Sequence, residues 1–121
     1  MAEHYSSFKR GGRRWLFQRL TAVFLIGVLA FHFVLLHFVN HAYEVSFLGT
    51  QARMSQVGYF LTMWLFLVTA TFHGVNGVYN ALINMGVEGS RKKAIGGVLA
   101  VAGLLLIVQG TRVALAMTNL V

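Results

Sequence analysis

Residues 58–83 read GYFLTMWLFLVTATFHGVNGVYNALI, an apolar segment that contains no Asp, Glu, Lys or Arg. At about 26 residues, it exceeds the roughly 20 residues that cross the hydrocarbon core of a bilayer as a helix. Lipid offers the backbone no hydrogen-bond partner, so a spanning segment has to be helical. Strand-like alternation of polar and apolar residues is absent. The segment therefore predicts a transmembrane helix.

Two further apolar segments flank this one, at about residues 16–39 and 94–117. Of the 121 residues, 57% are hydrophobic and 11% are charged, whereas a soluble domain carries about 25% charged residues. The chain is predicted to be an all-α membrane protein, with a three-helix transmembrane anchor at residues 15–121 after a basic tail at residues 1–14. The absence of cysteine excludes a disulfide scaffold, a thiolate metal site and a cysteine nucleophile.

Lysine and arginine are distributed unevenly between the two sides of these spans. Most of them precede the first span or the third, and the segment 40–57 has Arg53 alone. The positive-inside rule predicts that the N-terminus and the loop 84–93 are cytoplasmic, or on the equivalent matrix side, and that the C-terminus is outside. Because this topology accounts for the net charge of +7, the expected partner is membrane lipid and no nucleic acid is expected. The residues concerned are Lys9, Arg10, Arg13, Arg14, Arg91, Lys92 and Lys93.

His73 lies in the middle of the second span, with Gly74 beside it and Gly77 one helical turn further on. Polar side chains inside a membrane are costly and mark functional sites. A glycine at i+4 leaves a flat slot beside the imidazole, which a planar haem needs in order to reach an axial histidine. The other interpretation is a histidine that bonds to a neighbouring helix, with both glycines serving close packing. Residue types alone leave both interpretations open.

The first span holds His32 and His37, which are roughly 140° apart around a helix and cannot both face one partner closely. If Arg19 and Asn84 are level at the cytoplasmic edge, His32 lies roughly 20 Å and His73 roughly 16 Å into the membrane. These depths allow His32 and His73 to serve one haem or two different ones. His37, at roughly 27 Å, is a poor partner for His73 on a single iron.

Polar residues also mark the cytoplasmic edge of the spans. Arg19 could snorkel to lipid phosphate, pair with a haem propionate or donate to a quinone carbonyl. Asn84 could be a plain helix stop, because Gly86 follows it. In the third span, small residues recur along one face and predict close packing on another helix, in this chain or in a partner. They are Gly96, Ala100, Gly103, Gly110 and Ala114.

Two motifs resemble those of the membrane anchor subunits of succinate dehydrogenase and fumarate reductase. FQRLTA, residues 17–22, resembles the arginine–x–serine/threonine–small motif that opens the first helix of these anchors. HGVNG, residues 73–77, followed by Asn84, resembles the H-x-x-x-G-(x)6-D-Y pattern of their second helix. The similarity covers about residues 15–85, and the combination of both motifs in a three-helix chain makes it fairly specific.

The resemblance implies an electron-transfer subunit of the cytoplasmic or mitochondrial inner membrane. In this family a flavoprotein oxidises succinate, an iron–sulfur subunit passes the electrons on, and two membrane anchors bind quinone and, in most members, haem b. His73 matches the axial haem ligand of the second helix, and His32 matches a first-helix histidine of some relatives. One haem or two, shared with the partner anchor, are expected. Alone the chain is expected to be inactive, since it has no flavin motif and no cysteine for an iron–sulfur cluster.

The resemblance also implies a quinone site, for which Arg19, Thr21 and Asn84 are the candidate residues. The family's Asp–Tyr pair is Asn84-Met85 here, and Met85 cannot donate a hydrogen bond. Two other functions compete with this one. A small transport or channel subunit would explain the polar residues in the spans, but no acidic residue lies in any span. A structural anchor without a cofactor would merely pack its histidines.

Overall fold

The computed structural model describes residues 2–118, and side chains from residue 12 onward. Over this range the chain is helical and contains no strand, which confirms the predicted all-α membrane protein. Three helices are long and apolar enough to cross a membrane, at Gly12–Val39, Val57–Asn84 and Gly89–Ala116. The elements in order are α1 (Ala2–Val34), its π-helical extension η1 (Leu35–Val39), the short η2 (Ala42–Glu44), α2 (Phe47–Met54), α3 (Val57–Asn84) and α4 (Gly89–Ala116).

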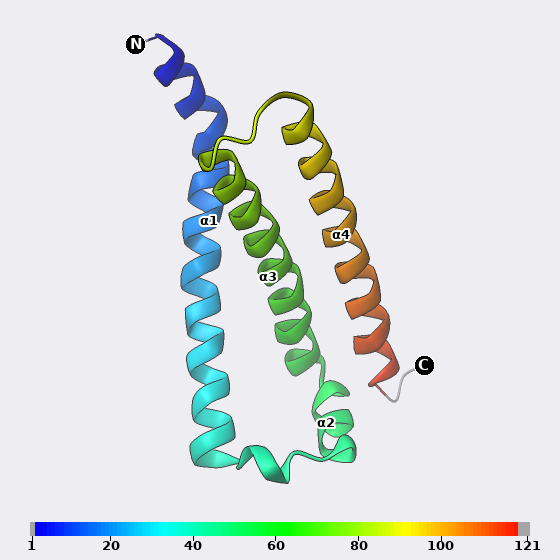
Figure 1. The fold of residues 1–121 in the computed structure, drawn as a ribbon. Coiled ribbons are helices and arrows are strands. Elements are labelled where there is room, and N and C mark those ends of the chain that lie inside the picture. The colour runs from blue at the N-terminus through cyan, green and yellow to red at the C-terminus, as the bar shows by residue number, and fades with distance from the viewer. Residues whose placement is uncertain (1, 119–121) are drawn as a thin grey trace.

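Helix α3 is the central element, because it packs against α1, α2 and α4 (Figure 1). Figure 1 shows α1 and α3 close together toward the N-terminal half of α1 and diverging toward α2. The chain between them, with η2 and α2, crosses from the end of α1 to the start of α3. The arrangement is therefore an antiparallel up–down–up bundle in which α3 determines where the other helices lie.

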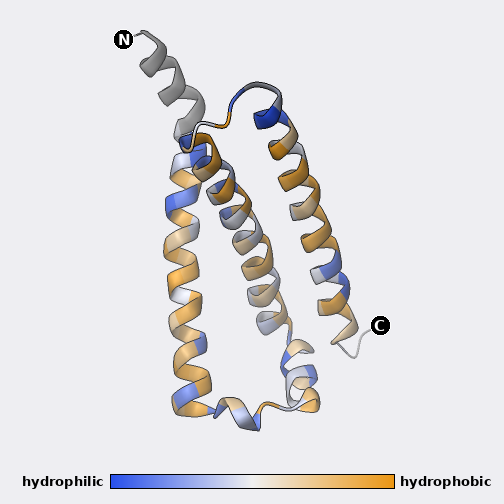
Figure 2. Ribbon diagram, viewed as in Figure 1, coloured by the Kyte–Doolittle hydropathy of each residue, from blue (hydrophilic) through white to orange (hydrophobic). Residues whose placement is uncertain are grey.

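Most residues of the three long helices are hydrophobic, with a few hydrophilic ones between them, and strongly hydrophilic residues gather at the start of α4 (Figure 2). Val28 and Met54 are the only buried hydrophobic side chains in the described part of the chain. Large side chains such as Val23, Leu29 and Leu104 are between 64% and 70% exposed. Such a surface is unsuited to water. In a membrane, the same surface is covered by lipid and by other transmembrane helices.

The sharp turn between α3 and α4 has a local cause in the sequence. Gly86 adopts a φ of 92°, which a residue with a side chain rarely adopts. The amide of Gly86 donates to the carbonyl of Ile83 at 3.0 Å, and that of Val87 donates to the carbonyl of Leu82 at 3.2 Å. This is the Schellman arrangement, which satisfies the last carbonyls of a helix. Asn84 is the last residue of α3, in agreement with a helix stop.

Helices α3 and α4 are held together by small residues on α4. A Cβ atom on Gly103 would lie 3.2 Å from Cγ2 of Val75, and one on Gly110 would lie 2.6 Å from Cδ2 of Leu67. Beside Gly110, the indole of Trp64 donates to the hydroxyl of Thr111 at 3.0 Å. The small-residue face of the third span therefore packs on α3 within this chain, which settles the alternative that the sequence left open.

We expect Gly103→Leu to destabilise the bundle by about 1–3 kcal/mol, because the added side chain would enter the contact with Val75. The matched control is Gly97→Leu on the same helix, where an added Cβ meets nothing within 4 Å. The measurement is the melting temperature of the detergent-solubilised protein, followed by loss of its helical circular dichroism. Equal melting temperatures for the two variants would contradict this account of the α3–α4 interface.

Candidate functional site

A pair of amide side chains joins α1 to α3 inside the bundle. The Asn76 side-chain amide donates to Oε1 of Gln18 at 2.7 Å, and Nε2 of Gln18 donates to the backbone carbonyl of His73 at 3.3 Å. Asn76 is only 7% exposed. Because a buried amide without a partner is costly, these complementary bonds fix how α1 sits against α3.

One turn further along α1, the hydroxyl of Thr21 lies 3.0 Å from Nδ1 of His73. The same hydroxyl oxygen is 2.7 Å from the carbonyl oxygen of Phe17 and 3.1 Å from that of Gln18. Residues three or four apart lie on the same face of a helix. Gln18 and Thr21 therefore both face α3, and His73 and Asn76 both face α1. We call the four residues Gln18, Thr21, His73 and Asn76 the polar bridge.

The glycines beside His73 have different surroundings. A Cβ atom on Gly77 would lie 3.4 Å from Nε2 of Gln18, so the space beside Gly77 holds the Gln18 amide. The slot expected on that side is therefore occupied, because Gln18 needs this space to reach the carbonyl of His73. At Gly74 an added Cβ would meet nothing within 4 Å. The position of Gly74, next to His73 in the chain, therefore borders open space.

The structure places His32 and His73 at different levels. The His32 ring lies 6.2 Å, between centroids, from that of Phe66 on α3, and its Nδ1 contacts the carbonyl of Val28 at 2.9 Å. Phe66 precedes His73 by two helical turns, or roughly 10 Å along α3. One iron cannot bond both rings in this arrangement.

The sequence-based estimate of how far His32 and His73 lie from the membrane edge was wrong. It assumed that Arg19 and Asn84 lie at the same depth. Thr21 contacts His73, and Asn84 lies eleven residues beyond His73, so α3 continues roughly 16 Å past the level of Thr21. His37 is exposed, and its ring stacks on Phe33 with centroids 4.4 Å apart.

The structure does not bring the three candidate quinone residues together. Arg19 lies on an exposed face of α1, where its guanidinium carbon stands 5.3 Å from the centroid of the Trp15 ring. Thr21 faces α3 and belongs to the polar bridge. Asn84 is exposed at the end of α3. Any site built from Arg19 therefore faces lipid or another subunit, away from α3.

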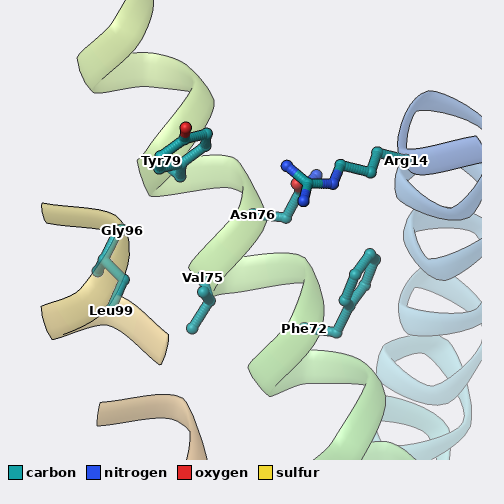
Figure 3. Close-up of a pocket in the computed structure, with 7 residues that line it drawn as sticks. All are labelled: Arg14, Phe72, Val75, Asn76, Tyr79, Gly96 and Leu99. Carbon is teal, nitrogen blue, oxygen red and sulfur yellow. The ribbon is translucent and has the colours of Figure 1, made fainter. Parts of the chain in front are cut away.

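A cavity of about 320 Å³ lies on the other side of Asn76, between α1, α3 and α4. Figure 3 shows the Arg14 side chain reaching from α1 toward Asn76, with Tyr79 and Val75 on α3 and Gly96 and Leu99 on α4. Such a cavity can accept a polar or anionic group. From the sequence, Arg14 was used only for topology, and Gln18 and Asn76 appeared only as letters within the two motifs. The only signal in the sequence was helical periodicity, which places Gln18 on the same face of its helix as Thr21 and Asn76 on the same face as His73.

Among the side chains that the structure describes, residues 12–118, no group of three or more His, Cys, Asp or Glu is placed to hold a metal ion. A haem iron is held differently, by one or two axial side chains and the macrocycle itself. The residue predicted from the sequence for such an axial bond is His73, which lies next to the open position Gly74.

Comparisons with known proteins agree with the two motifs. The model of a family described as "Succinate dehydrogenase/Fumarate reductase transmembrane subunit" matches residues 2–110. A curated protein of Thermoplasma acidophilum, named "Succinate dehydrogenase hydrophobic membrane anchor subunit", is 27% identical over 108 residues, which cover 88% of this chain and 87% of that protein. No solved structure matches the chain.

If the amide pair fixes α1 on α3, the single variants Gln18→Leu and Asn76→Leu should each destabilise the protein by about 1–3 kcal/mol, because the first leaves the buried Asn76 amide unpaired and the second leaves Oε1 of the half-buried Gln18 without its donor. The double variant should lose less than the sum of the two, because both amides are then gone. Gln109→Leu, at an exposed position of α4, is the control and should change little. Unfolding in mixed micelles gives the free energies, and strictly additive losses would contradict the pairing.

Proposed function

The chain belongs to the family of succinate dehydrogenase and fumarate reductase transmembrane subunits, and we propose that it ligates haem b through His73 and supports quinone reduction in such a complex. It is a multi-pass integral membrane protein, and membership of the family makes it a membrane anchor subunit. The proposed partners are a flavoprotein, an iron–sulfur subunit and a second membrane anchor. The chain contributes no catalytic head of its own.

The observation that carries the haem proposal is the state of the His73 ring. Its Nδ1 is held by Thr21 of another helix, whereas Nδ1 of His32 and of His37 lies against a carbonyl of its own helix, and Nε2 of His73 forms no hydrogen bond with the described residues. The neighbouring position Gly74 presents no side chain on that part of α3. An imidazole with one nitrogen held and the other free is the usual state of a histidine that ligates a metal.

A single ligand from this chain implies that the second axial ligand comes from another subunit. His32 lies too far along the bundle to share an iron with His73, so we assign it to a second haem if the complex carries two. Haem b, when bound, supplies a one-electron carrier between the iron–sulfur subunit and quinone. The residues of this chain hold that group in place through His73 and exclude water with their apolar faces.

We propose that Arg19 is the residue of this chain that interacts with the quinone. A quinone carbonyl gains negative charge on reduction, and a fixed cation beside it stabilises that charge. Arg19 is exposed and stacked on Trp15, which keeps the guanidinium at the face that another subunit would cover. The Thr21 hydroxyl contacts His73, and Asn84 lies at the end of α3, well beyond the level of Thr21. Neither residue therefore lies beside Arg19 in a common quinone site.

His73→Ala should remove one b-type signal from the reduced-minus-oxidised spectrum of the purified complex, because the iron loses an axial bond. His37→Ala is the matched control, since His37 is exposed and stacked on its own helix, and it should leave the spectrum unchanged. His32→Ala should affect a different signal from the one lost with His73. An unchanged spectrum in an assembled His73→Ala complex, or no haem in the wild type, would contradict the haem proposal and favour an anchor without a cofactor.

Arg19→Gln should lower succinate–quinone activity about tenfold or more, since a hydrogen bond to a charged group contributes about 1.5–3 kcal/mol. Electron transfer from succinate to a soluble dye should persist, because that step needs no quinone. Arg13→Gln removes the same charge from an exposed position of the same helix and should preserve both activities. Equal retention of both activities in Arg19→Gln would show that its charge is not used at the quinone.

A further inference from the structure

The Thr21 hydroxyl stands between its own helix and the ring of His73. Its oxygen is 2.7 Å from the Phe17 carbonyl oxygen, 3.1 Å from that of Gln18 and 3.0 Å from Nδ1 of His73. A hydroxyl has one hydrogen to donate and two lone pairs with which to accept. Three neighbours thus compete for a single proton.

The distances decide where that proton lies. A separation of 2.7 Å is the usual length of an O–H···O bond, and two oxygens that close need a hydrogen between them. The carbonyl of Phe17 can only accept, so the Thr21 hydroxyl donates to it. Its lone pairs are left for His73, and the contact at 3.0 Å is then a bond from Nδ1–H to the hydroxyl oxygen. It follows that Nδ1 carries the proton, and in the neutral imidazole Nε2 then carries the lone pair.

His73 differs from the other described histidines of the spans in what holds its ring. Nδ1 of His32 and Nδ1 of His37 each lie within 3.0 Å of the carbonyl four residues earlier on their own helix. The His73 ring is held by a residue of another helix. Its orientation therefore depends on the position of α1 against α3, which the Gln18–Asn76 bond fixes.

We propose that Thr21 is a positioning residue for the haem ligand: it selects the Nδ1–H tautomer of His73, fixes the plane of the ring and makes Nε2 a stronger donor to iron. The inference rests on the haem ligation proposed above. A partner that accepts from the second ring nitrogen raises the basicity of a ligating histidine and sets its orientation. The Thr21 hydroxyl is suited to this, because its own bond to the Phe17 carbonyl polarises the oxygen.

This role differs from that of Thr21 as an ordinary interhelical contact. A purely structural bond would affect the stability of the bundle but would leave the electronic state of the iron unchanged. The positioning role predicts a change at the iron even in a variant that assembles normally. A less basic imidazole stabilises oxidised iron less, so loss of the hydroxyl should raise the midpoint potential of the haem.

The first experiment uses the purified complex with Thr21→Val, which keeps the shape of the side chain and lacks the hydroxyl, and with Thr21→Ser, which keeps the hydroxyl. The control is Thr62→Val, because the Thr62 hydroxyl bonds only to its own helix, at the Gly58 carbonyl. A redox titration should show a raised midpoint potential in Thr21→Val, with Thr21→Ser and Thr62→Val close to the wild type. A potential unchanged in an assembled Thr21→Val complex would overturn the proposal.

The second experiment needs neither haem nor the Thr21→Val variant. Nitrogen-15 NMR of the full wild-type chain in detergent, produced without haem and labelled at histidine, reports which ring nitrogen is protonated, and His73→Gln assigns the His73 signals. Protonated Nδ1 and unprotonated Nε2 are expected, and the reverse would overturn the inference even if Thr21→Val fails to fold. A complex that lacks haem while His73 is the Nδ1–H tautomer would instead overturn the proposed haem ligation, and with it the role of Thr21 toward iron, whereas the assignment of the tautomer would stand.

Discussion

A side-chain amide in a hydrocarbon environment has to find a hydrogen-bond partner, and Asn76 finds it in Gln18. Most of the arrangement of α1 follows from this bond. It fixes which turn of α1 meets which turn of α3, and this register brings Thr21 to the ring of His73. A shift of one turn would leave the amide unpaired and move the hydroxyl away from the imidazole. The bond that holds two helices together is thus also the constraint on the proposed haem ligand.

Helix α3 separates two kinds of packing. Toward α1 it presents His73 and Asn76, and it makes directional hydrogen bonds there. Toward α4 it presents mainly apolar side chains such as Val75 and Leu67, which lie against glycines at short range, beside the hydrogen bond from Trp64 to Thr111. Packing against glycine gives close contact without polar atoms, whereas the hydrogen bonds specify register. The two interfaces leave the remaining faces of the helices for lipid and for other subunits.

Much of the fold was predictable from the sequence, because length and hydropathy alone indicate helices that cross a membrane. The glycine at residue 86 also predicted the end of α3. The pairing across the bundle was not predictable, because no local pattern says which turn of one helix faces which turn of another. For that reason the depth comparison failed, as it assumed that Arg19 and Asn84 are level. His73 was recognisable as a candidate site, whereas the contribution of Gln18 and Thr21 to its surroundings required the structure.

The central claim is that α1 holds His73 of α3 in a fixed orientation so that Nε2 can bond a haem iron. The most direct measurement is an electron cryomicroscopy map of the intact complex at a resolution that shows individual side chains. The account predicts planar haem density at Nε2 of His73, with Thr21 against Nδ1 and Gln18 against Asn76. A map in which His73 contacts only protein, or in which haem is bound while Thr21 faces elsewhere, would contradict it.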